Sequence, residues 1–302
     1  MRVQYFNGGL ANQVFQYIFY RYGQLTTGHP EDWFLDDSFF FFKHQHNGYE
    51  LERVFGLKPN LLSEQLGPDA WNILVENRKN GIGMADNLAN LGFHVSMIAE
   101  AQNYKKDNPF SGKVYPIPCS EYHPEILMLQ DEIIYYFGYW INKDWLYAYK
   151  ELLSEELTFP IITEEQNLQY ASLIKSTLSV GIHIRRGDYV QIGMGLDPKF
   201  YHSAAKQILN SYPEATFFVF SDDPQWCRQN ADTLGLSLAK DTVFIEGNMG
   251  GKNYIDLQLL SMCKGMILSN SAFSYLASLL DCNLAFCITP TPWREVVINS
   301  KL

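Results

Sequence analysis

The second half of the chain alternates short apolar runs with stretches in which apolar residues recur every three or four positions. The apolar runs predict strands at 180–184, 215–223, 242–247, the start of 265–282, and 284–288. The periodic stretches predict helices at 198–212, 224–235, 253–263 and the end of 265–282. Alternation of this kind is typical of a parallel sheet with helices on both faces.

The first half opens on the same pattern. A strand at 2–6 is followed by the turn NGGLANQ and a helix at 12–25. One face of that helix carries an apolar stripe of Val14, Ile18, Tyr22 and Leu25. Two phenylalanines lie beside the stripe, Phe15 and Phe19. Residues 30–130 have no comparable regularity, and another apolar run covers 132–140.

The stretch 154–167, SEELTFPIITEEQN, contains a proline and four glutamates, which favours a linker. A length of 302 residues also favours two domains. We therefore expect an α/β fold with lobes at 1–158 and 159–302 and a site in the cleft between them.

Three predicted strands of the second half end in polar motifs: HIRRGD, SDD and SNS. Ligands of open α/β sheets bind beyond the carboxyl ends of the strands, so these motifs should meet at one edge. The side chains concerned are His183, Arg185, Arg186, Asp188, Asp222, Asp223, Asn270 and Ser271. Two arginines facing a helix that starts at Ser271 indicate an anion site, with phosphate favoured. The alternative is that the arginines pair with nearby acids in a structural network.

The N-terminal loop NGGLANQ is a second candidate. Gly8 and Gly9 allow positive φ and a close approach of a ligand to the backbone. Asn12 and Gln13 could face that ligand, although an asparagine at this place is by default a helix cap. The loop does not spell G-x-G-x-x-G, so it is no dinucleotide fingerprint.

The loop GNMGGKN at 247–253 fails the phosphate-loop pattern, and Lys252 would add at most one cation. D-x-D and H-E-x-x-H motifs are absent from the sequence. We therefore expect arginine, and no metal, to meet the charge of a phosphate.

Composition narrows the class of protein. A net charge of −10 argues against a nucleic-acid partner, which would need a basic face. The five cysteines include no C-x-x-C pair and fit a reducing compartment. No charged leader precedes an apolar run at the N-terminus, and the run at 37–44 is too short to span a bilayer. The expectation is a soluble, cytoplasmic protein.

Together these motifs resemble the α1,2-fucosyltransferase family of bacteria and animals. NGGLANQVFQY resembles that family's GGLGNQMFQY signature, and HIRRGDY matches its H-x-R-R-G-D-Y motif. FFVFSDDPQW and DLQLLSMCKGMILSNSAFSYLAS resemble its two remaining blocks, in the same order. The chain departs from the family pattern at Ala11, where glycine is usual, and at Tyr275-Leu276, where paired tryptophan is common.

The resemblance implies two Rossmann-like lobes of the GT-B type. It also implies inverting, metal-independent transfer of L-fucose from GDP-fucose in α1,2 linkage to a terminal β-galactoside. The lobe 159–302 would hold the GDP-sugar, and 1–158 would meet mainly the acceptor. A bacterial form suggests surface polysaccharide such as O-antigen, whose lipid-linked acceptor would bring the enzyme loosely to the inner membrane face.

Residue roles carry over by position. Arg185 would contact the diphosphate, Arg186 and His183 would support the same region, and Ser271 would bind phosphate. Donor binding would also involve Asp222, Asn270 and Asp256, the last of these opposite guanine. Asp188 is a candidate base for the acceptor hydroxyl, or else a brace for an arginine. His183 could likewise transfer a proton, but an orienting role is favoured.

Two other classes of function stay open. One is a glycosyltransferase of the same scaffold that uses another GDP-sugar or forms another linkage. The other is a non-catalytic glycan-binding protein built on aromatic platforms such as Trp140, Trp145 and Trp293.

Overall fold

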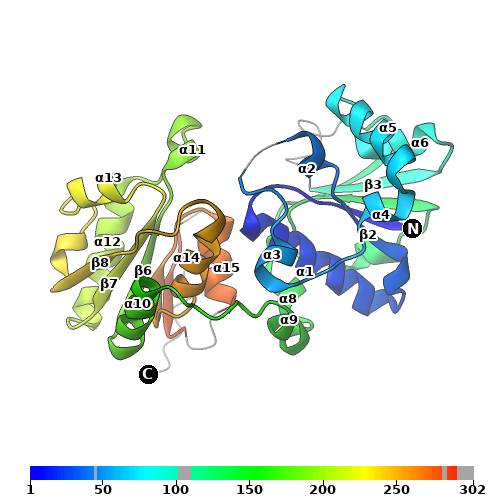
Figure 1. The fold of residues 1–302 in the computed structure, drawn as a ribbon. Coiled ribbons are helices and arrows are strands. Elements are labelled where there is room, and N and C mark those ends of the chain that lie inside the picture. Colours follow the sequence, from blue (N-terminus) through cyan, green and yellow to red (C-terminus); the bar gives the residue numbers. More distant parts are fainter. Residues whose placement is uncertain (44–45, 101–109, 281–283, 291–302) are drawn as a thin grey trace. The chain divides into compact units, whose positions relative to one another are not determined.

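Two compact units make up the computed structural model, Met1–Phe159 and Pro160–Leu302. The structure describes residues 1–43, 46–100, 110–280 and 284–290. Within these, each unit contains a five-stranded, fully parallel sheet with helices packed on it (Figure 1). The predicted α/β class is confirmed. The division of the chain falls inside the stretch 154–167.

The sheet of the N-terminal unit has the strand order β2-β1-β5-β3-β4. Its strands are β1 (Arg2–Tyr5), β2 (Trp33–Asp36), β3 (Val95–Glu100), β4 (Lys113–Ile117) and β5 (Ile133–Phe137). Its helices are α1 (Leu10–Thr27), α2 (Phe39–Phe42), α3 (Leu51–Phe55), α4 (Leu62–Leu66), α5 (Pro68–Lys79), α6 (Met84–Asn90), α8 (Lys143–Tyr147) and α9 (Lys150–Glu156), with 3-10 turns η1 (Pro30–Asp32) and η2 (Pro124–Met128).

The predicted helix at 12–25 is confirmed as α1, which is longer at both ends. It begins directly after Gly9 and ends at Gly28, whose φ of 71° suits a left-handed cap. Burial extends well beyond the predicted stripe and includes Gln13, Gln16 and Gln24. Because α1 is enclosed on most sides, its polar residues must find partners inside the protein.

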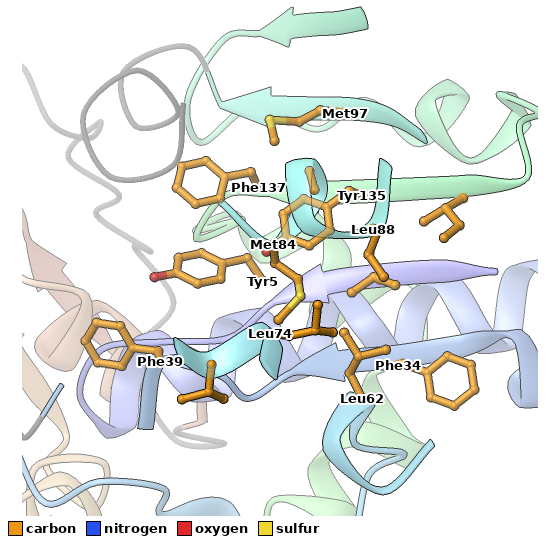
Figure 2. Close-up of a cluster of buried hydrophobic side chains, with 14 of the residues drawn as sticks. Tyr5, Phe34, Phe39, Leu62, Leu74, Met84, Leu88, Met97, Tyr135 and Phe137 are labelled. Atoms are coloured by element: carbon orange, nitrogen blue, oxygen red, sulfur yellow. The ribbon is translucent and has the colours of Figure 1, made fainter. Parts of the chain in front are cut away.

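Apolar side chains fill the space between the sheet and the helices of the N-terminal unit. Figure 2 shows one such cluster, to which β1, β2, β3, β5 and the helices α2, α4, α5 and α6 contribute. In a second, aromatic cluster of this unit, Phe19 of α1 stacks on Trp140 with ring centroids 4.1 Å apart and meets Trp145 edge-on. Trp140 is 1% exposed and Trp145 0%, so neither can be an aromatic platform of the glycan-binding alternative, which named both residues. Trp293 lies outside the described residues.

The sheet of the C-terminal unit has the order β10-β9-β6-β7-β8. Its strands are β6 (Ser179–Ile184), β7 (Thr216–Ser221), β8 (Asp241–Phe244), β9 (Gly265–Ile267) and β10 (Phe286–Ile288). Its helices are α10 (Glu165–Ser176), α11 (Gly187–Gln191), α12 (Pro198–Ser211), α13 (Pro224–Gln229), α14 (Asn253–Leu260) and α15 (Ala272–Leu280), with 3-10 turns η3 (Leu236–Leu238) and η4 (Gly250–Lys252).

Strand order in this unit reverses between β6 and β9. The chain runs outward from β6 through β7 to β8, and then returns to the other side of β6 for β9 and β10. A reversal of this kind opens a crevice at the carboxyl ends of the two strands, where ligands of such sheets bind. The loops that follow β6 and β9 therefore occupy the favoured position for a site.

One predicted helix of this unit is too long. The stretch predicted as a helix to residue 235 forms α13, which ends at Gln229. Beyond it, the Asn230 side chain donates to the Trp226 carbonyl at 2.9 Å and competes for a backbone acceptor, a habit that disfavours asparagine inside helices. No helix within the described residues combines the length and the apolar character needed to cross a membrane.

Asp37 follows β2 and is a buried acid, 5% exposed. It accepts from the backbone N–H of Ser63 at 3.2 Å and from the Ser63 hydroxyl at 2.7 Å. Burial is the main cause that raises its pKa from 3.8 to about 6, and the neighbouring Asp36 adds to it. Ionisation therefore costs the folded state stability as pH rises from 3.8 to about 6.

Replacement of Asp37 by asparagine removes that cost. Relative to the parent chain, we expect Asp37→Asn to gain about 2 kcal/mol in unfolding free energy when pH is raised from about 4.5 to about 7.5. Urea unfolding at both pH values measures the gain. Asp69→Asn, at an exposed position of α5, should show no comparable change. Equal effects of Asp37→Asn at the two pH values would contradict the assignment.

Candidate active site

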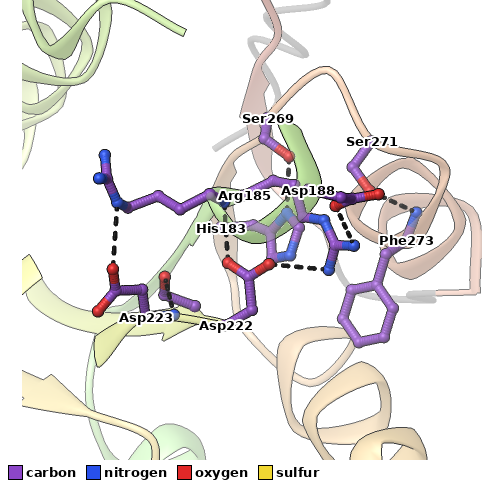
Figure 3. Close-up of polar contacts among 10 residues, drawn as sticks. His183, Arg185, Asp188, Asp222, Asp223, Ser269, Ser271 and Phe273 are labelled. Carbon is purple, nitrogen blue, oxygen red and sulfur yellow. Dashed lines mark hydrogen bonds and ion pairs between the residues drawn. The ribbon is translucent and has the colours of Figure 1, made fainter. Parts of the chain in front are cut away.

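Three loops at the carboxyl edge of the C-terminal sheet bring most of the predicted residues together. Figure 3 shows Arg185, Asp188, Asp222 and Ser271 in one group with His183 and Ser269. Strand register explains the meeting. β6 pairs with β7 so that Ile184 faces Ser221, and with β9 so that Ile182 faces Ile267. The residues that follow these strands are consequently neighbours.

Arg185 is held between two carboxylates. Its Nη2 donates to Oδ1 of Asp188 at 2.6 Å, and its Nη1 lies 3.0 Å from Oδ2 of Asp222. The guanidinium also lies over the Tyr189 ring, 5.4 Å from its centroid. Two ion pairs and a ring contact fix a long side chain that would otherwise sample many rotamers.

Arg186 is held in a similar way by different partners. Its Nε donates to Oδ2 of Asp223 at 3.4 Å, and its guanidinium lies 3.4 Å from the centroid of the Trp226 ring. Stacking of a guanidinium on an indole is the most favourable of the cation–π pairings. The face of Arg186 is therefore covered while its edge stays available for hydrogen bonds.

Asp222 organises the whole loop. Besides its ion pair with Arg185, it accepts from the backbone N–H of Arg186 at 2.8 Å through Oδ1. A Cβ at Gly187 would lie only 2.5 Å from Oδ2 of Asp222, so the close approach requires glycine. The lack of space for a side chain next to Asp222 thus explains why the HIRRGD motif has glycine at position 187. Asp222 itself contacts both arginines, through the Arg185 guanidinium and the Arg186 backbone N–H.

The predicted structural network of arginines and acids does exist here, with three carboxylates around two guanidinium groups. The ion pairs with these acids do not use all the N–H donors of the two arginines. Their side chains keep 29% and 23% exposure for Arg185 and Arg186, and a guanidinium has five N–H donors. The acids therefore orient the two groups, and donors remain for an incoming anion.

His183 is enclosed and neutral. Its Nδ1 lies 2.7 Å from the Ser269 hydroxyl, and its ring stacks on Phe273 with centroids 5.2 Å apart. Burial, with a smaller contribution from the charge of Arg185, lowers its pKa to about 3. A buried ring in this state joins β6 to the loop after β9, which favours the orienting role over proton transfer.

The loop after β9 leads into α15. The Ser271 hydroxyl accepts from the backbone N–H of Phe273 at 3.3 Å, so Ser271 stands at the start of the helix as expected. The Asn270 side chain donates to the Met194 carbonyl at 2.8 Å and thereby ties the segment that follows α11 to this loop. The start of α15 is thus held in a fixed place next to Arg185.

Asp256 belongs to a neighbouring group. It lies in the first turn of α14, and its Oδ1 accepts from the Asn248 side chain at 2.8 Å. Burial raises its pKa to about 7, and the hydrogen bond from Asn248 opposes that rise. Because α14 connects β8 to β9, its first turn belongs to the same edge of the sheet as the arginine loops.

The NGGLANQ loop lies in the N-terminal unit. Gly8 has a φ of 81°, and a Cβ there would lie 2.8 Å from the Asn12 amide. A Cβ at Gly9 would lie 3.3 Å from the His46 ring. Gly9 occupies the cap position of α1, so the default interpretation of Asn12 as the cap is wrong.

Gln13 has a structural task in this loop. Its amide nitrogen donates to the carbonyls of Gly8 and Gly48, both at 2.8 Å, and its oxygen accepts from the Glu50 N–H at 2.9 Å. These bonds fasten the loop to residues 48–50. Lys252, the proposed extra cation of the C-terminal unit, pairs instead with Glu164 at 3.3 Å.

Sequence reasoning missed several contributors. Tyr189 and Trp226, which cover the arginine faces, stand inside motifs already recognised, and their position beside paired arginines is a signal that could have been read. Ser269 could have been found as the first residue of the SNS turn. Asn248 lies in the loop GNMGGKN, which fails the phosphate-loop pattern, and Asn167 ends the stretch 154–167; neither pattern indicates that the two side chains pair.

Comparisons with known proteins show the family of the chain. The model of glycosyl transferase family 11 matches residues 73–300. An α-1,2-colitosyltransferase of Escherichia coli is 34% identical over 167 residues, which are 53% of this chain and 56% of the relative. A galactoside α-(1,2)-fucosyltransferase 2 of Gorilla gorilla gorilla is 25% identical over 181 residues, 54% of this chain and 52% of the relative. The chain thus spans about half the length of these curated relatives.

Solved structures share the fold. Fucosyltransferase NodZ from Bradyrhizobium aligns with a TM-score of 0.51 and 14% identity over 99% of this chain and 98% of that one. A NodZ α-1,6-fucosyltransferase soaked with GDP-fucose aligns with a TM-score of 0.50 and 14% identity over 96% and 95%. The expected GT-B architecture is thereby confirmed. With a family model that covers most of its length and motifs in the expected order, the chain belongs to glycosyl transferase family 11, the family of the α1,2-fucosyltransferases.

Proposed function

We propose that the chain transfers L-fucose from GDP-fucose to a terminal β-galactoside, in α1,2 linkage, with inversion and without a metal ion. The observation that carries the proposal is the pair Arg185 and Arg186 at the carboxyl end of β6, braced by acids beside the start of α15. Relatives named for α-1,2 transfer of fucose and colitose support the linkage.

The arginines would bind the diphosphate and stabilise it as it leaves. In displacement at an anomeric carbon, negative charge grows on the departing diphosphate. Donors that already point to that place stabilise the charge without reorganising. Arg185 supplies such donors, Arg186 supports them, and the N–H groups at the start of α15 with Ser271 add a partial positive charge. The neutral His183 keeps that start in position.

Other residues would complete the donor site. Asp222 acts through the arginines that it holds, and Asn270 through the segment it fastens. Asp256 would accept hydrogen bonds from guanine, whose N1–H and exocyclic amine suit a carboxylate. In this proposal the unit Met1–Phe159, with Gly8, Gly9, Asn12 and Gln13 in its first loop, meets mainly the acceptor.

The acceptor would be a galactose-terminated glycan of a surface polysaccharide such as O-antigen. A lipid-linked precursor of that kind would bring the enzyme to the cytoplasmic face of the inner membrane. A second candidate donor is favoured by one relative, the α-1,2-colitosyltransferase at 34% identity. Colitose transfer would use the same arginines, because they would bind the diphosphate of the donor and not its sugar.

The function is tested by incubating the protein with GDP-fucose, and separately with the colitosyl nucleotide, in the presence of a panel of β-galactosides. NMR then determines the linkage of each product. We expect a Fucα1,2-Gal product formed in the presence of EDTA. A product only from the colitosyl donor would move the assignment to the second candidate. Binding of glycans without turnover of either donor would refute both.

Asp188 is proposed as the base that accepts the proton of the attacking hydroxyl. Its side chain is 55% exposed, which leaves it accessible beside Arg185. We expect Asp188→Asn to lower kcat by about 100-fold or more and to remove the acidic limb of the pH–rate profile. Asp223→Asn, which removes the carboxylate paired with Arg186, is the matched control and should keep that limb. If the acidic limb of the pH–rate profile is unchanged in Asp188→Asn, Asp188 is not the base and only orients Arg185.

A further inference from the structure

We propose that Asn167 and Asn248 are positioning residues for nucleotide specificity: their paired side-chain amides orient Asp256 so that it selects guanine. This inference deepens the proposed GDP-sugar function and rests on it. The sequence analysis assigned neither asparagine a role in ligand binding.

The two asparagines bind one another reciprocally. Asn167 Nδ2 donates to Asn248 Oδ1 at 2.8 Å, and Asn248 Nδ2 donates to Asn167 Oδ1 at 2.9 Å. Asn248 Nδ2 also donates to Oδ1 of Asp256 at 2.8 Å. Asn167 and Asn248 are 4% and 3% exposed, so water does not compete for these bonds. The chain links α10, the segment after β8, and α14.

Reciprocal bonding determines which way each amide points. If the Asn248 amide turned over, its oxygen would face both the Asp256 carboxylate and the oxygen of Asn167. Three acceptors would then meet without a donor, at a cost of several hydrogen bonds in a buried place. Asn167 therefore acts through Asn248, because it keeps the Asn248 N–H directed at Asp256.

A carboxylate held in this way has one oxygen assigned to the protein and further lone pairs for a ligand. Guanine offers two parallel donors, N1–H and the exocyclic amine, to a carboxylate. Hypoxanthine offers only N1–H, and uracil only one N–H between two carbonyls. A correctly turned, ionised Asp256 would prefer the three bases in the order guanine, hypoxanthine, uracil. A rotated or protonated one would lose that order.

The Asn248 bond also favours the ionised form of Asp256. Burial and the Asn248 bond are the two influences on its pKa, which lies at about 7. Titratable groups on the elements packed against α14 are Glu164, Glu165, Tyr170 and Lys175 at or in α10, Lys252 in η4, and Tyr275 in α15. Glu164 and Lys252 pair with each other at 3.3 Å. Loss of the Asn248 donor would therefore shift Asp256 toward the protonated state and weaken guanine binding near neutral pH.

The experiment is calorimetric titration of the full chain with GDP, IDP and UDP at pH values from about 6 to 8.5. We expect Asn248→Ala to weaken GDP binding about 10-fold to 100-fold at neutral pH, the range for a hydrogen bond to a charged group, with a smaller loss for UDP. GDP binding should recover partly at the highest pH. Asn167→Ala leaves the Asn248–Asp256 bond in place and should cost only a few-fold.

Controls separate positioning from general damage. Asn77→Ala removes a comparable amide–amide bond in the N-terminal unit, where Asn77 donates to Asn87 at 2.9 Å, and should leave nucleotide binding unchanged. Turnover at saturating donor should fall by less than about threefold in Asn248→Ala, because the arginines that act on the leaving group are untouched. If Asn248→Ala does not fold, Asn248→Asp serves instead: a second carboxylate beside Asp256 should move the pH midpoint of GDP binding upward.

Outcomes distinguish the two levels of the proposal. If the parent chain prefers GDP but the Asn248 and Asn167 variants keep its base preference and pH midpoint, the amide pair has no role in specificity and this inference is overturned. If the parent chain itself shows no preference for GDP, the proposed function fails at the donor, whatever the variants do.

Discussion

Arg185→Ala is expected to lower kcat by about two to three orders of magnitude, the usual effect of removing one donor that stabilises a developing anion. Arg185 is the arginine fixed from both sides, by Asp188 and Asp222, and its donors cannot be replaced by the stacked Arg186. Steady-state rates with saturating GDP-fucose and acceptor measure the loss. Circular dichroism should show an intact fold, because the side chain lies at a partly exposed edge.

Two further variants test whether the loss in Arg185→Ala is specific to the position and to the guanidinium group. Arg228→Ala is the matched control: Arg228 also pairs with an acid, Glu246 at 2.8 Å, and also lies over a ring, that of Phe244 at 4.2 Å. It stands outside the three loops of the site and should retain near-normal turnover. Arg185→Lys keeps the charge but lacks the forked donor geometry, so an intermediate rate is expected. Near-normal turnover in Arg185→Ala would refute the proposed role.

Gly23→Ala should destabilise the N-terminal unit by about 3 kcal/mol, although alanine is the better helix former. A Cβ at Gly23 of α1 would overlap the ring of Trp33. That ring cannot move aside. It is fully buried, stacks on Tyr136 with centroids 5.2 Å apart, and donates through Nε1 to the Thr27 hydroxyl at 3.1 Å. Thermal unfolding should show a decrease in Tm of about 6–12 °C.

A double variant tests the cause of that loss. In Gly23→Ala with Trp33→Phe the smaller ring leaves room for the new methyl group, so the two changes together should cost less than their sum. Gly195→Ala, where the nearest contact of a Cβ is Val190 at 3.9 Å, is the control for the same chemical change in open space. Strict additivity of Gly23→Ala and Trp33→Phe would show that the two residues do not compete for space.

The C-terminal unit was more predictable than the N-terminal one for a physical reason. Strands such as β6 and β7 are buried on both faces, and burial of that kind leaves continuous apolar runs that are visible in the sequence. The strand β4 contains a proline and is partly exposed, and β2 has only four residues. Neither strand therefore gives an apolar run that is distinct from the rest of the stretch 30–130. Their pairing with β3 and β1 depends on contacts that no local pattern contains.

The candidate site divides in the same way. Polar motifs after three apolar runs were sufficient to predict that arginines, acids and a helix start would meet, because parallel strands end at one edge. Which residue contacts which within the site could not be predicted from the sequence. Arg186 meets Asp222 across 36 positions, and His183 meets Ser269 across 86. A shift of β6 by one residue against β7 would have changed the first of these pairs, and a shift against β9 would have changed the second.

By itself the sequence determined the α/β class and the presence of paired arginines at a strand end, since both depend on residues close to one another in the chain. Only the tertiary structure decided that Asp222 braces both arginines, that His183 is buried and neutral, that Trp140 and Trp145 belong to the core, and that Asn167 reaches Asn248 across 81 positions. These facts depend on strand register and on burial, which arise when distant segments pack against each other.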